Sequence, residues 1–138
     1  MNLDDLPTGY RPSPDEPYMN PRQLAYFRRK LLDWRQALLD EWQRTVSQSQ
    51  TESENLGDEA DRASWESQHT LELRTRDRYH RLLGEIGAAL KRIDDGSYGY
   101  CEDTGDPIGL QRLEARPIAS LTVEAQERRE RANAQYGQ

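Results

Sequence analysis

Apolar residues recur at alternating spacings of three and four positions along two separate stretches of the chain. This spacing places the apolar side chains along one face of a helix and is typical of a coiled-coil seam. The first stretch contains Leu24, Phe27, Leu31, Trp34 and Leu38, and the second contains Tyr79, Leu82, Ile86, Leu90 and Ile93, with Leu83 and Ala89 alongside. The pattern predicts two long amphipathic helices.

The start of the first helix is marked by several signals. Asn20 can cap the helix, and Pro21 suits its first position. Gln23 stands where a capping box needs an amide, and Met19 and Leu24 can form the flanking hydrophobic contact. We expect this helix to begin at Pro21 and to end near residues 48–50, where a polar run from 45 to 55 replaces the apolar pattern.

The second helix is expected to begin at Asp58 or Asp61 and to run to about Asp94, before the Asp95-Gly96 stop signal. Because both seams lie far from the polar link, the two helices should pair as an antiparallel hairpin with a polar tip. Thr122 is expected to cap a last helix.

These signals predict an all-α fold, a long antiparallel coiled-coil hairpin with a small globular domain. Four prolines and a glycine in residues 1–18 predict an extended or disordered arm. Residues 19–95 should form the hairpin, with its tip near 51–63. Residues 96–138 should form the small domain, which ends in the last helix.

Composition supports an elongated helical protein that works through a protein partner. The chain has 34% hydrophobic and 32% charged residues, and its net charge of −6 disfavours binding to nucleic-acid phosphates. It has no apolar run long enough to span a membrane and no signal-peptide pattern at its amino terminus. Its single cysteine excludes an intramolecular disulfide. We expect a cytoplasmic protein with no membrane association.

The predicted tip is strongly acidic. Six acidic residues and one basic residue, Arg62, lie between Glu52 and Glu66, which gives this segment a net charge of −5. Asp58 and Asp61 stand where a helix begins, so capping of free N–H groups is an alternative explanation for those two carboxylates. One cap does not require six acids, and the excess favours a functional tip.

Four positions in the small domain have the spacing of a four-cysteine zinc site. They are Cys101, Thr104, Thr122 and Ala125, so three of the four positions lack a thiol. Hydroxyl and methyl groups do not build a tetrahedral thiolate site, and we therefore expect no zinc and no other cofactor. Glu102 and Asp103 beside Cys101 should raise its pKa, which would leave the thiol an unreactive remnant.

Two other sets of residues carry weaker signals. His69 and His80 lie eleven positions apart on one predicted helix, too far along the axis to share a metal ion. We interpret both as polar-face residues. Trp34, Trp42 and Trp65 could stack on nucleic-acid bases, but the local charge is negative, and packing within the hairpin is favoured.

Several sequence blocks occur in the order found in one bacterial family. They are YMNPRQLAYFRR, GDEADRAS, LELRTRDR, YGYCEDTG and IGLQRLEARP. With these blocks the chain resembles the DksA/TraR family between about Tyr18 and Arg131. That family's members insert a coiled-coil tip into the secondary channel of RNA polymerase. The resemblance implies a cytoplasmic regulator, without enzymatic activity, that binds RNA polymerase and alters initiation at selected promoters such as those of ribosomal RNA.

The resemblance also assigns roles to individual residues of the tip. The family's motif of two aspartates three apart, followed by Arg and Ala, corresponds to Asp58, Asp61, Arg62 and Ala63. By this resemblance, Asp61 acts near the polymerase active centre, Ala63 permits close approach, and Asp58 assists. A carboxylate in a narrow channel can bias mobile elements electrostatically.

The family's shared binding surface for the alarmone ppGpp corresponds to Asn55, Arg78, Leu82 and Arg116. Arginines suit phosphate groups, although a solvated helix face and a packing arginine are alternative interpretations of Arg78 and Arg116. Two positions that carry Lys in well-known members are Glu85 and Gln126 here. The charge of Glu85 should weaken the response to ppGpp.

Two other functional classes fit an acidic hairpin. A transcript-cleavage factor of the Gre type would use the tip to hold magnesium, but such factors carry a larger β-rich domain, which a remainder of about forty residues cannot supply. A structural coiled coil would form an obligate dimer. We expect a monomer with RNA polymerase as partner, ppGpp as an effector, and no sequence-specific DNA binding of its own.

Overall fold

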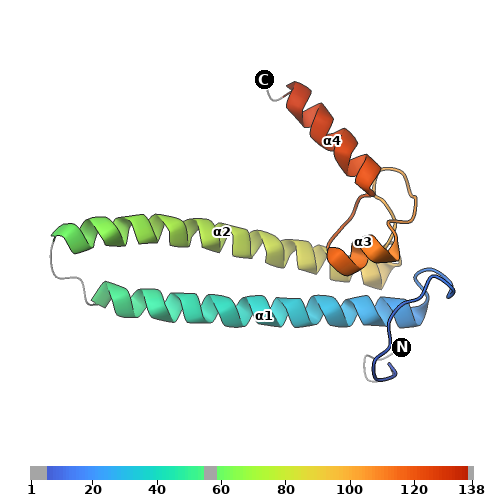
Figure 1. The fold of residues 1–138 in the computed structure, drawn as a ribbon, viewed down its shortest axis with the longest axis horizontal. Coiled ribbons are helices and arrows are strands. Elements are labelled where there is room, and N and C mark those ends of the chain that lie inside the picture. Colours follow the sequence, from blue (N-terminus) through green and yellow to red (C-terminus); the bar gives the residue numbers. More distant parts are fainter. Residues whose placement is uncertain (1–5, 55–58, 137–138) are drawn as a thin grey trace. The chain divides into compact units, whose positions relative to one another are not determined.

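The computed structural model describes residues 6–54 and 59–136, and it describes the side chains of these residues except at 49, 52–54, 59–62 and 136. Four helices occur in this part of the chain, namely α1 (Pro21–Glu54), α2 (Glu59–Asp95), α3 (Leu110–Ala115) and α4 (Val123–Tyr136) (Figure 1). An isolated antiparallel bridge joins Tyr100 to Pro107. The predicted all-α class is confirmed.

The start of α1 is capped as expected, with one difference in the hydrogen bonding. The Asn20 side chain accepts hydrogen bonds from the backbone N–H groups of Arg22 and Gln23, at 2.9 and 3.2 Å. The buried Gln23 amide oxygen accepts from the backbone N–H of Met19, at 2.8 Å, one residue before the cap. Two of the free N–H groups of the first helical turn are thereby satisfied.

The predicted end of α1 at residues 48–50 was wrong, because the helix continues to Glu54. The polar run is helical from Thr45 to Glu54, and the hydroxyl groups of its two threonines form hydrogen bonds inside the helix. Thr45 donates to the carbonyl of Glu41 at 3.0 Å, and Thr51 donates to that of Ser47 at 3.1 Å. The end of α2 follows the prediction, since Asp95 is its last residue and Gly96 follows with a φ of 85°.

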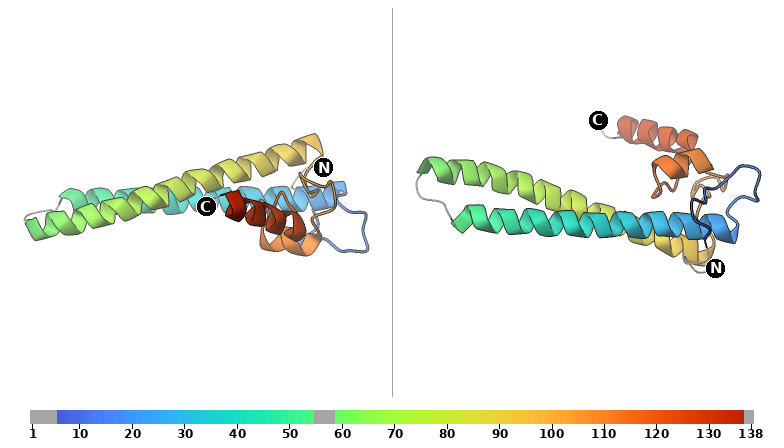
Figure 2. Two further views of the ribbon diagram at one scale, coloured as in Figure 1. Left: turned by 90° about the horizontal axis from the view of Figure 1, so that it is seen from above. Right: turned by 60° about the horizontal axis from the view of Figure 1, so that its bottom comes forward.

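The chain divides into two compact units, each containing part of α1 and part of α2. We call residues 1–32 and 86–138 the terminal unit and residues 33–85 the central unit. The compact units therefore differ from the three predicted regions, since the first part of the hairpin groups with the small domain. In each unit the α1 and α2 segments lie side by side and run in opposite directions (Figures 1 and 2).

The core of the terminal unit is built on the predicted seam. Phe27 and Leu31 of α1 and Ile86 and Ala89 of α2 are completely buried. The ring of Tyr98, also completely buried, lies 5.7 Å from that of Phe27. Burial of each large side chain contributes roughly 1.5–3 kcal/mol of transfer free energy. The seam residues nearest the small domain therefore join the hairpin to that domain.

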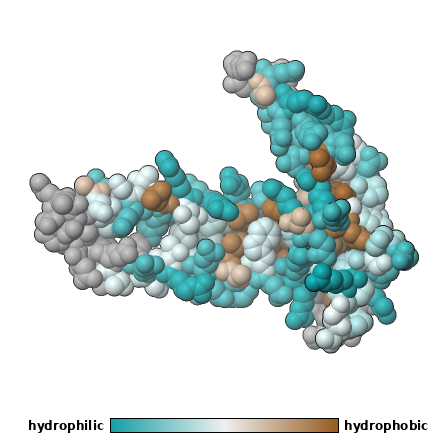
Figure 3. Space-filling view, viewed as in Figure 1, coloured by the Kyte–Doolittle hydropathy of each residue, from teal (hydrophilic) through white to brown (hydrophobic). Residues whose placement is uncertain are grey.

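Among the described residues, the central unit has fewer buried apolar side chains than the terminal unit. The rings of Trp42 and Tyr79 stack with their centroids 5.1 Å apart and their planes at 17°. Beyond this stack the facing positions are mostly polar, including Thr45, Gln48 and Thr75. In the view of Figure 3, the described surface is mostly hydrophilic, with small separate hydrophobic patches.

The amino-terminal segment, described from residue 6, forms turns rather than an extended arm. The Tyr10 hydroxyl donates to the Glu16 carboxylate, at 3.0 Å, inside the segment. Tyr18 connects the segment to the small domain, because its hydroxyl donates to the carbonyl of Gly99 at 2.7 Å and accepts from the N–H of Gly109 at 2.9 Å. The prolines exclude helix here but do not prevent folded turns.

Gly99 is required where the amino-terminal segment meets the small domain. Its φ of 91° lies in the region that favours glycine, and an added Cβ would lie 2.7 Å from the Met19 side chain.

α4 begins as predicted, since the Thr122 hydroxyl accepts a hydrogen bond from the N–H of Ala125 at 3.2 Å. The six-residue helix α3 was not predicted.

Candidate functional site

The tip predicted from the sequence lies partly outside the described residues. Asn55 and Asp58 are not described, and Asp61 and Arg62 are placed only as backbone in the first turns of α2. Ala63 is exposed. The structure therefore places Asp61 within the first four residues of α2, where a carboxylate also suits the positive end of the helix dipole.

The residues of the predicted ppGpp surface belong to different units. Arg78, exposed, and Leu82, half-buried, line one groove of the central unit together with Trp34, Trp42 and Tyr79. Arg116, exposed, lies in the terminal unit directly after α3. The structure therefore brings Arg78 and Leu82 together in one groove. Arg116 belongs to the other unit and is described only within that unit.

Glu85 and Gln126, which stand where well-known family members carry Lys, have different surroundings. Glu85 is half-buried on α2, seven residues from Arg78. The amide oxygen of Gln126 accepts a hydrogen bond from Arg112, and its amide nitrogen donates to Glu130 at 3.1 Å. Arg112 also donates through Nε to the carbonyl of Leu121, at 2.9 Å. Gln126 therefore helps to attach α4 to α3.

The four positions with zinc-site spacing do converge. The Thr122 hydroxyl lies 3.8 Å from the Cys101 sulfur, and Ala125 packs with Cys101 and Leu121 in one buried apolar cluster. The Thr104 hydroxyl also forms a hydrogen bond with the Cys101 sulfur. Arg129 forms a two-pronged ion pair with Asp103, with Nε 2.8 Å from Oδ2, which connects α4 to the loop after Cys101.

The environment of the Cys101 thiol differs from the expectation. Burial raises its pKa, but hydrogen bonds from the Thr104 hydroxyl and from the backbone N–H groups of Thr122, Thr104 and Asp103 outweigh this effect and lower the pKa to about 7. The expected rise due to Glu102 and Asp103 was wrong, because the N–H groups that surround the sulfur stabilise its thiolate form.

Sequence models of two domains cover most of the chain. The model described as "DnaK suppressor protein DksA, N-terminal domain" matches residues 23–93, and that described as "Prokaryotic dksA/traR C4-type zinc finger" matches residues 96–131. The chain belongs to the DksA family. The two matches meet next to Asp95, where α2 ends.

Named relatives of this family member share most of its length. The RNA polymerase-binding transcription factor DksA of Caulobacter vibrioides is 62% identical over 122 residues, which cover 88% of this chain and 86% of that protein. The factor of the same name from Escherichia coli is 49% identical over 115 residues, which cover 83% of this chain and 76% of that protein.

A solved structure has the same fold. The transcription factor DksA2 of Pseudomonas aeruginosa superposes with a TM-score of 0.80 and 42% sequence identity, covering 88% of this chain and 94% of that one. The agreement supports the predicted fold, a coiled-coil hairpin with a small domain at the carboxyl-terminal end of the sequence.

The match to a zinc finger contradicts our prediction that zinc is absent, because that domain is described as a zinc-binding one of the four-cysteine type. The donor atoms of this chain do not fit such a site. Cys101 offers the one thiol among the four positions, and the described residues contain no group of three or more His, Cys, Asp or Glu side chains placed to hold a metal. We therefore derive no function of the chain from a zinc ion.

In the described ranges, no helix combines the length and the apolar character needed to cross a membrane.

Proposed function

We propose that this chain binds RNA polymerase and regulates transcription initiation, and that it does so without catalysing a reaction itself. The observation that carries the proposal is the 62% identity to a factor named for polymerase binding, together with the hairpin fold. Because bacterial RNA polymerase is cytoplasmic, the proposal places the chain in the cytoplasm. It acts as a monomer and does not recognise DNA sequence.

The working part of the proposal is the acidic tip. Asp61 biases mobile elements near the polymerase active centre, Asp58 assists, and Ala63, which follows Arg62 in the same motif, permits close approach. A carboxylate acts more strongly in a narrow channel than in bulk water, because the effective dielectric constant there is lower. The net charge of −5 over residues 52–66 supports this assignment beyond the needs of helix capping.

The proposed effect of ppGpp rests on Asn55, Arg78, Leu82 and Arg116. Arg78 is exposed beside a groove that contains aromatic side chains, so its guanidinium group is available for a phosphate. Glu85 on the same helix opposes this attraction. Under the proposal, ppGpp strengthens the regulator only modestly.

Two measurements with purified proteins test the proposed function. The first is binding of the chain to RNA polymerase from Caulobacter vibrioides, the source of the 62% identical relative. The second is transcription from a ribosomal RNA promoter with and without the chain, in the presence and absence of ppGpp. We expect saturable binding and altered initiation. A chain that does not bind polymerase, or that binds it and leaves transcription from a panel of promoters unchanged, would contradict the proposal.

A further inference from the structure

A pocket opens between α1 and α2 within the central unit. Its volume is about 290 Å³, and its lining includes Gln48 of α1 and Trp65, Gln68, His69 and Glu72 of α2. Trp65, Glu72, Tyr79 and Ile86 are each seven residues apart, so the pocket lies on the continuation of the α2 seam. Most of the side chains that line this part of the seam are polar or aromatic, where a coiled coil normally has aliphatic side chains.

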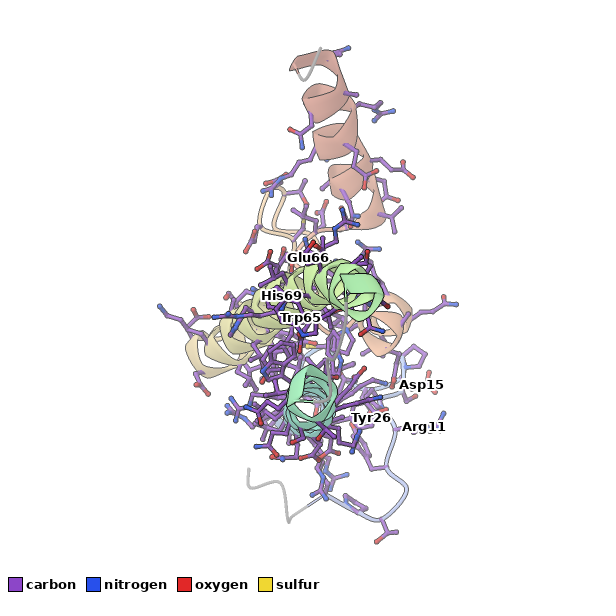
Figure 4. All side chains as sticks on the ribbon, turned by 90° about the vertical axis from the view of Figure 1, so that its left-hand side faces the viewer. Arg11, Asp15, Tyr26, Trp65, Glu66 and His69 are labelled. Atoms are coloured by element: carbon purple, nitrogen blue, oxygen red, sulfur yellow. The ribbon has the colours of Figure 1, made fainter. Side chains whose placement is uncertain are left out.

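Trp65 presents a fixed aromatic surface to this pocket. Its ring stacks on that of His69, with centroids 4.8 Å apart and planes at 9°. Figure 4 shows both residues on the side of α2 that faces α1, whereas Glu66 lies on the other side of α2. An indole ring held by a neighbouring ring loses little conformational entropy when a partner binds against it.

Glu72 supplies a carboxylate to the same pocket. Its side chain is only 21% exposed, and its Oε2 lies 3.7 Å from Nδ1 of His69. A carboxylate can accept several hydrogen bonds at once, and the amide oxygens of Gln48 and Gln68 are further acceptors. A guanidinium or ammonium group can donate hydrogen bonds to such acceptor oxygens and form a cation–π contact with the indole face.

We propose that this pocket receives a basic side chain of RNA polymerase, an Arg or Lys, held by Glu72 and the Trp65 ring. The inference rests on the proposed function and adds an anchor to it. Trp65 lies two residues after Ala63 in the sequence, so the first pocket residue of α2 closely follows the tip motif. The net charge of −5 over residues 52–66 attracts a basic surface to this region. The anchor contributes affinity, whereas Asp61 acts on the polymerase.

Competition binding to Caulobacter vibrioides RNA polymerase tests the anchor, with the full chain and the variants Glu72→Gln, Trp65→Leu and their combination. Asp77→Asn is the control, since it removes the same charge from an exposed position of α2 that does not line the pocket. Circular dichroism checks that each variant retains its helix content, and Trp65→Phe, which keeps an aromatic face, is included in case Trp65→Leu loosens the hairpin.

We expect Glu72→Gln and Trp65→Leu each to raise Kd about tenfold, the size of one charge-assisted or cation–π contact. Trp65→Phe should have a smaller effect, and Asp77→Asn should change Kd less than twofold. The combined variant should lose less than the product of the two single effects, because both groups hold the same cation. The anchor would be overturned if Glu72→Gln changed Kd no more than Asp77→Asn does. It would also be overturned if the Kd of the combined variant rose by the full product of the two single effects. Failure of the unaltered chain to bind would instead refute the proposed function, and the anchor with it.

Discussion

Tyr98 shows how one side chain holds the small domain against the hairpin. Its ring is completely buried beside Phe27, and its hydroxyl donates to the carbonyl of Pro117 at 2.7 Å. Burial raises the pKa of Tyr98 well above its ordinary value, so the hydroxyl stays protonated and remains a donor.

Tyr98→Phe should lower the free energy of unfolding by about 1–3 kcal/mol, because it leaves the Pro117 carbonyl without its donor. Urea denaturation followed by circular dichroism measures the change. Tyr100→Phe is the control at a more exposed tyrosine, 36% accessible, and should cost much less. Equal losses in the two variants would show that the hydrogen bond to Pro117 does not matter.

Glu85 is the residue expected to limit the response to ppGpp. Glu85→Lys should increase the effect of ppGpp on transcription, because it replaces a charge that repels phosphate with one that attracts it. Glu85→Gln separates removal of repulsion from gain of attraction and should give an intermediate response. Transcription measured over a series of ppGpp concentrations checks this, and three identical curves would show that charge at position 85 does not govern the effect.

At the scale of helices, the cap at Asn20 stabilises the beginning of α1. Asn20→Ala should cost about 1 kcal/mol, because the N–H groups of Arg22 and Gln23 lose their acceptor. Asn20→Asp retains an acceptor and should be nearly neutral. Thermal unfolding of the two variants measures the difference, and an unchanged stability in Asn20→Ala would mean that other groups satisfy this turn.

Glu114 attaches α3 to α1. Burial raises its pKa, but hydrogen bonds from Lys30, at 2.7 Å, and from the Tyr26 hydroxyl, at 3.0 Å, outweigh this effect and lower the pKa below its ordinary 4.5. Because the Glu114 pKa is lower in the folded chain than in the unfolded chain, the ionised carboxylate stabilises the fold. This contribution is fully present above about pH 4.5 and is lost as the pH falls through the pKa of Glu114 in the folded chain.

Glu114→Gln should therefore flatten the acid side of the stability profile. We expect the variant to lose less stability than the unaltered chain as the pH falls below 4.5. Its stability at neutral pH should be modestly lower, because the ion pair is partly exposed. Thermal unfolding at a series of pH values measures this, with the exposed Glu127→Gln as control. Parallel profiles for Glu114→Gln and the unaltered chain would contradict the assignment.

For the whole molecule, the hairpin could be predicted because its seam is a long repeating signal. Phe27, Leu31, Ile86 and Ile93 were named from spacing and are buried. The extension of α1 to Glu54 could not be predicted from apolar spacing, because this part of the helix is polar. The hydroxyls of Thr45 and Thr51 donate to backbone carbonyls of the same helix, so these polar residues do not end it. The six residues of α3 are too few to form a periodic pattern.

The candidate site was only partly accessible to sequence reasoning. The tip residues came from resemblance and stay a prediction, since the structure does not describe the side chains of Asp58 and Asp61. The ring stack of Trp65 on His69 depends on side-chain orientation, which spacing along a helix does not specify. Likewise, the hydrogen bonds that lower the Cys101 pKa come from the Thr104 hydroxyl and from backbone N–H groups that the fold brings to the sulfur, whereas the adjacent charges in the sequence suggested a raised pKa.

The central claim is that the tip acts on RNA polymerase through Asp61. The most direct measurement is the lifetime of a ribosomal RNA promoter complex with RNA polymerase alone, with the unaltered chain, and with Asp61→Asn. Asparagine caps a helix about as well as aspartate, so the substitution removes the charge and keeps the cap. Each protein is used at a concentration that saturates the polymerase in competition binding.

We expect the unaltered chain to change the lifetime and Asp61→Asn to bind with nearly the same affinity while leaving the lifetime at its value for polymerase alone. Asp61→Ala should add about 1 kcal/mol of lost stability if Asp61 also caps α2. An Asp61→Asn protein that binds and changes the lifetime as the unaltered chain does would contradict the claim.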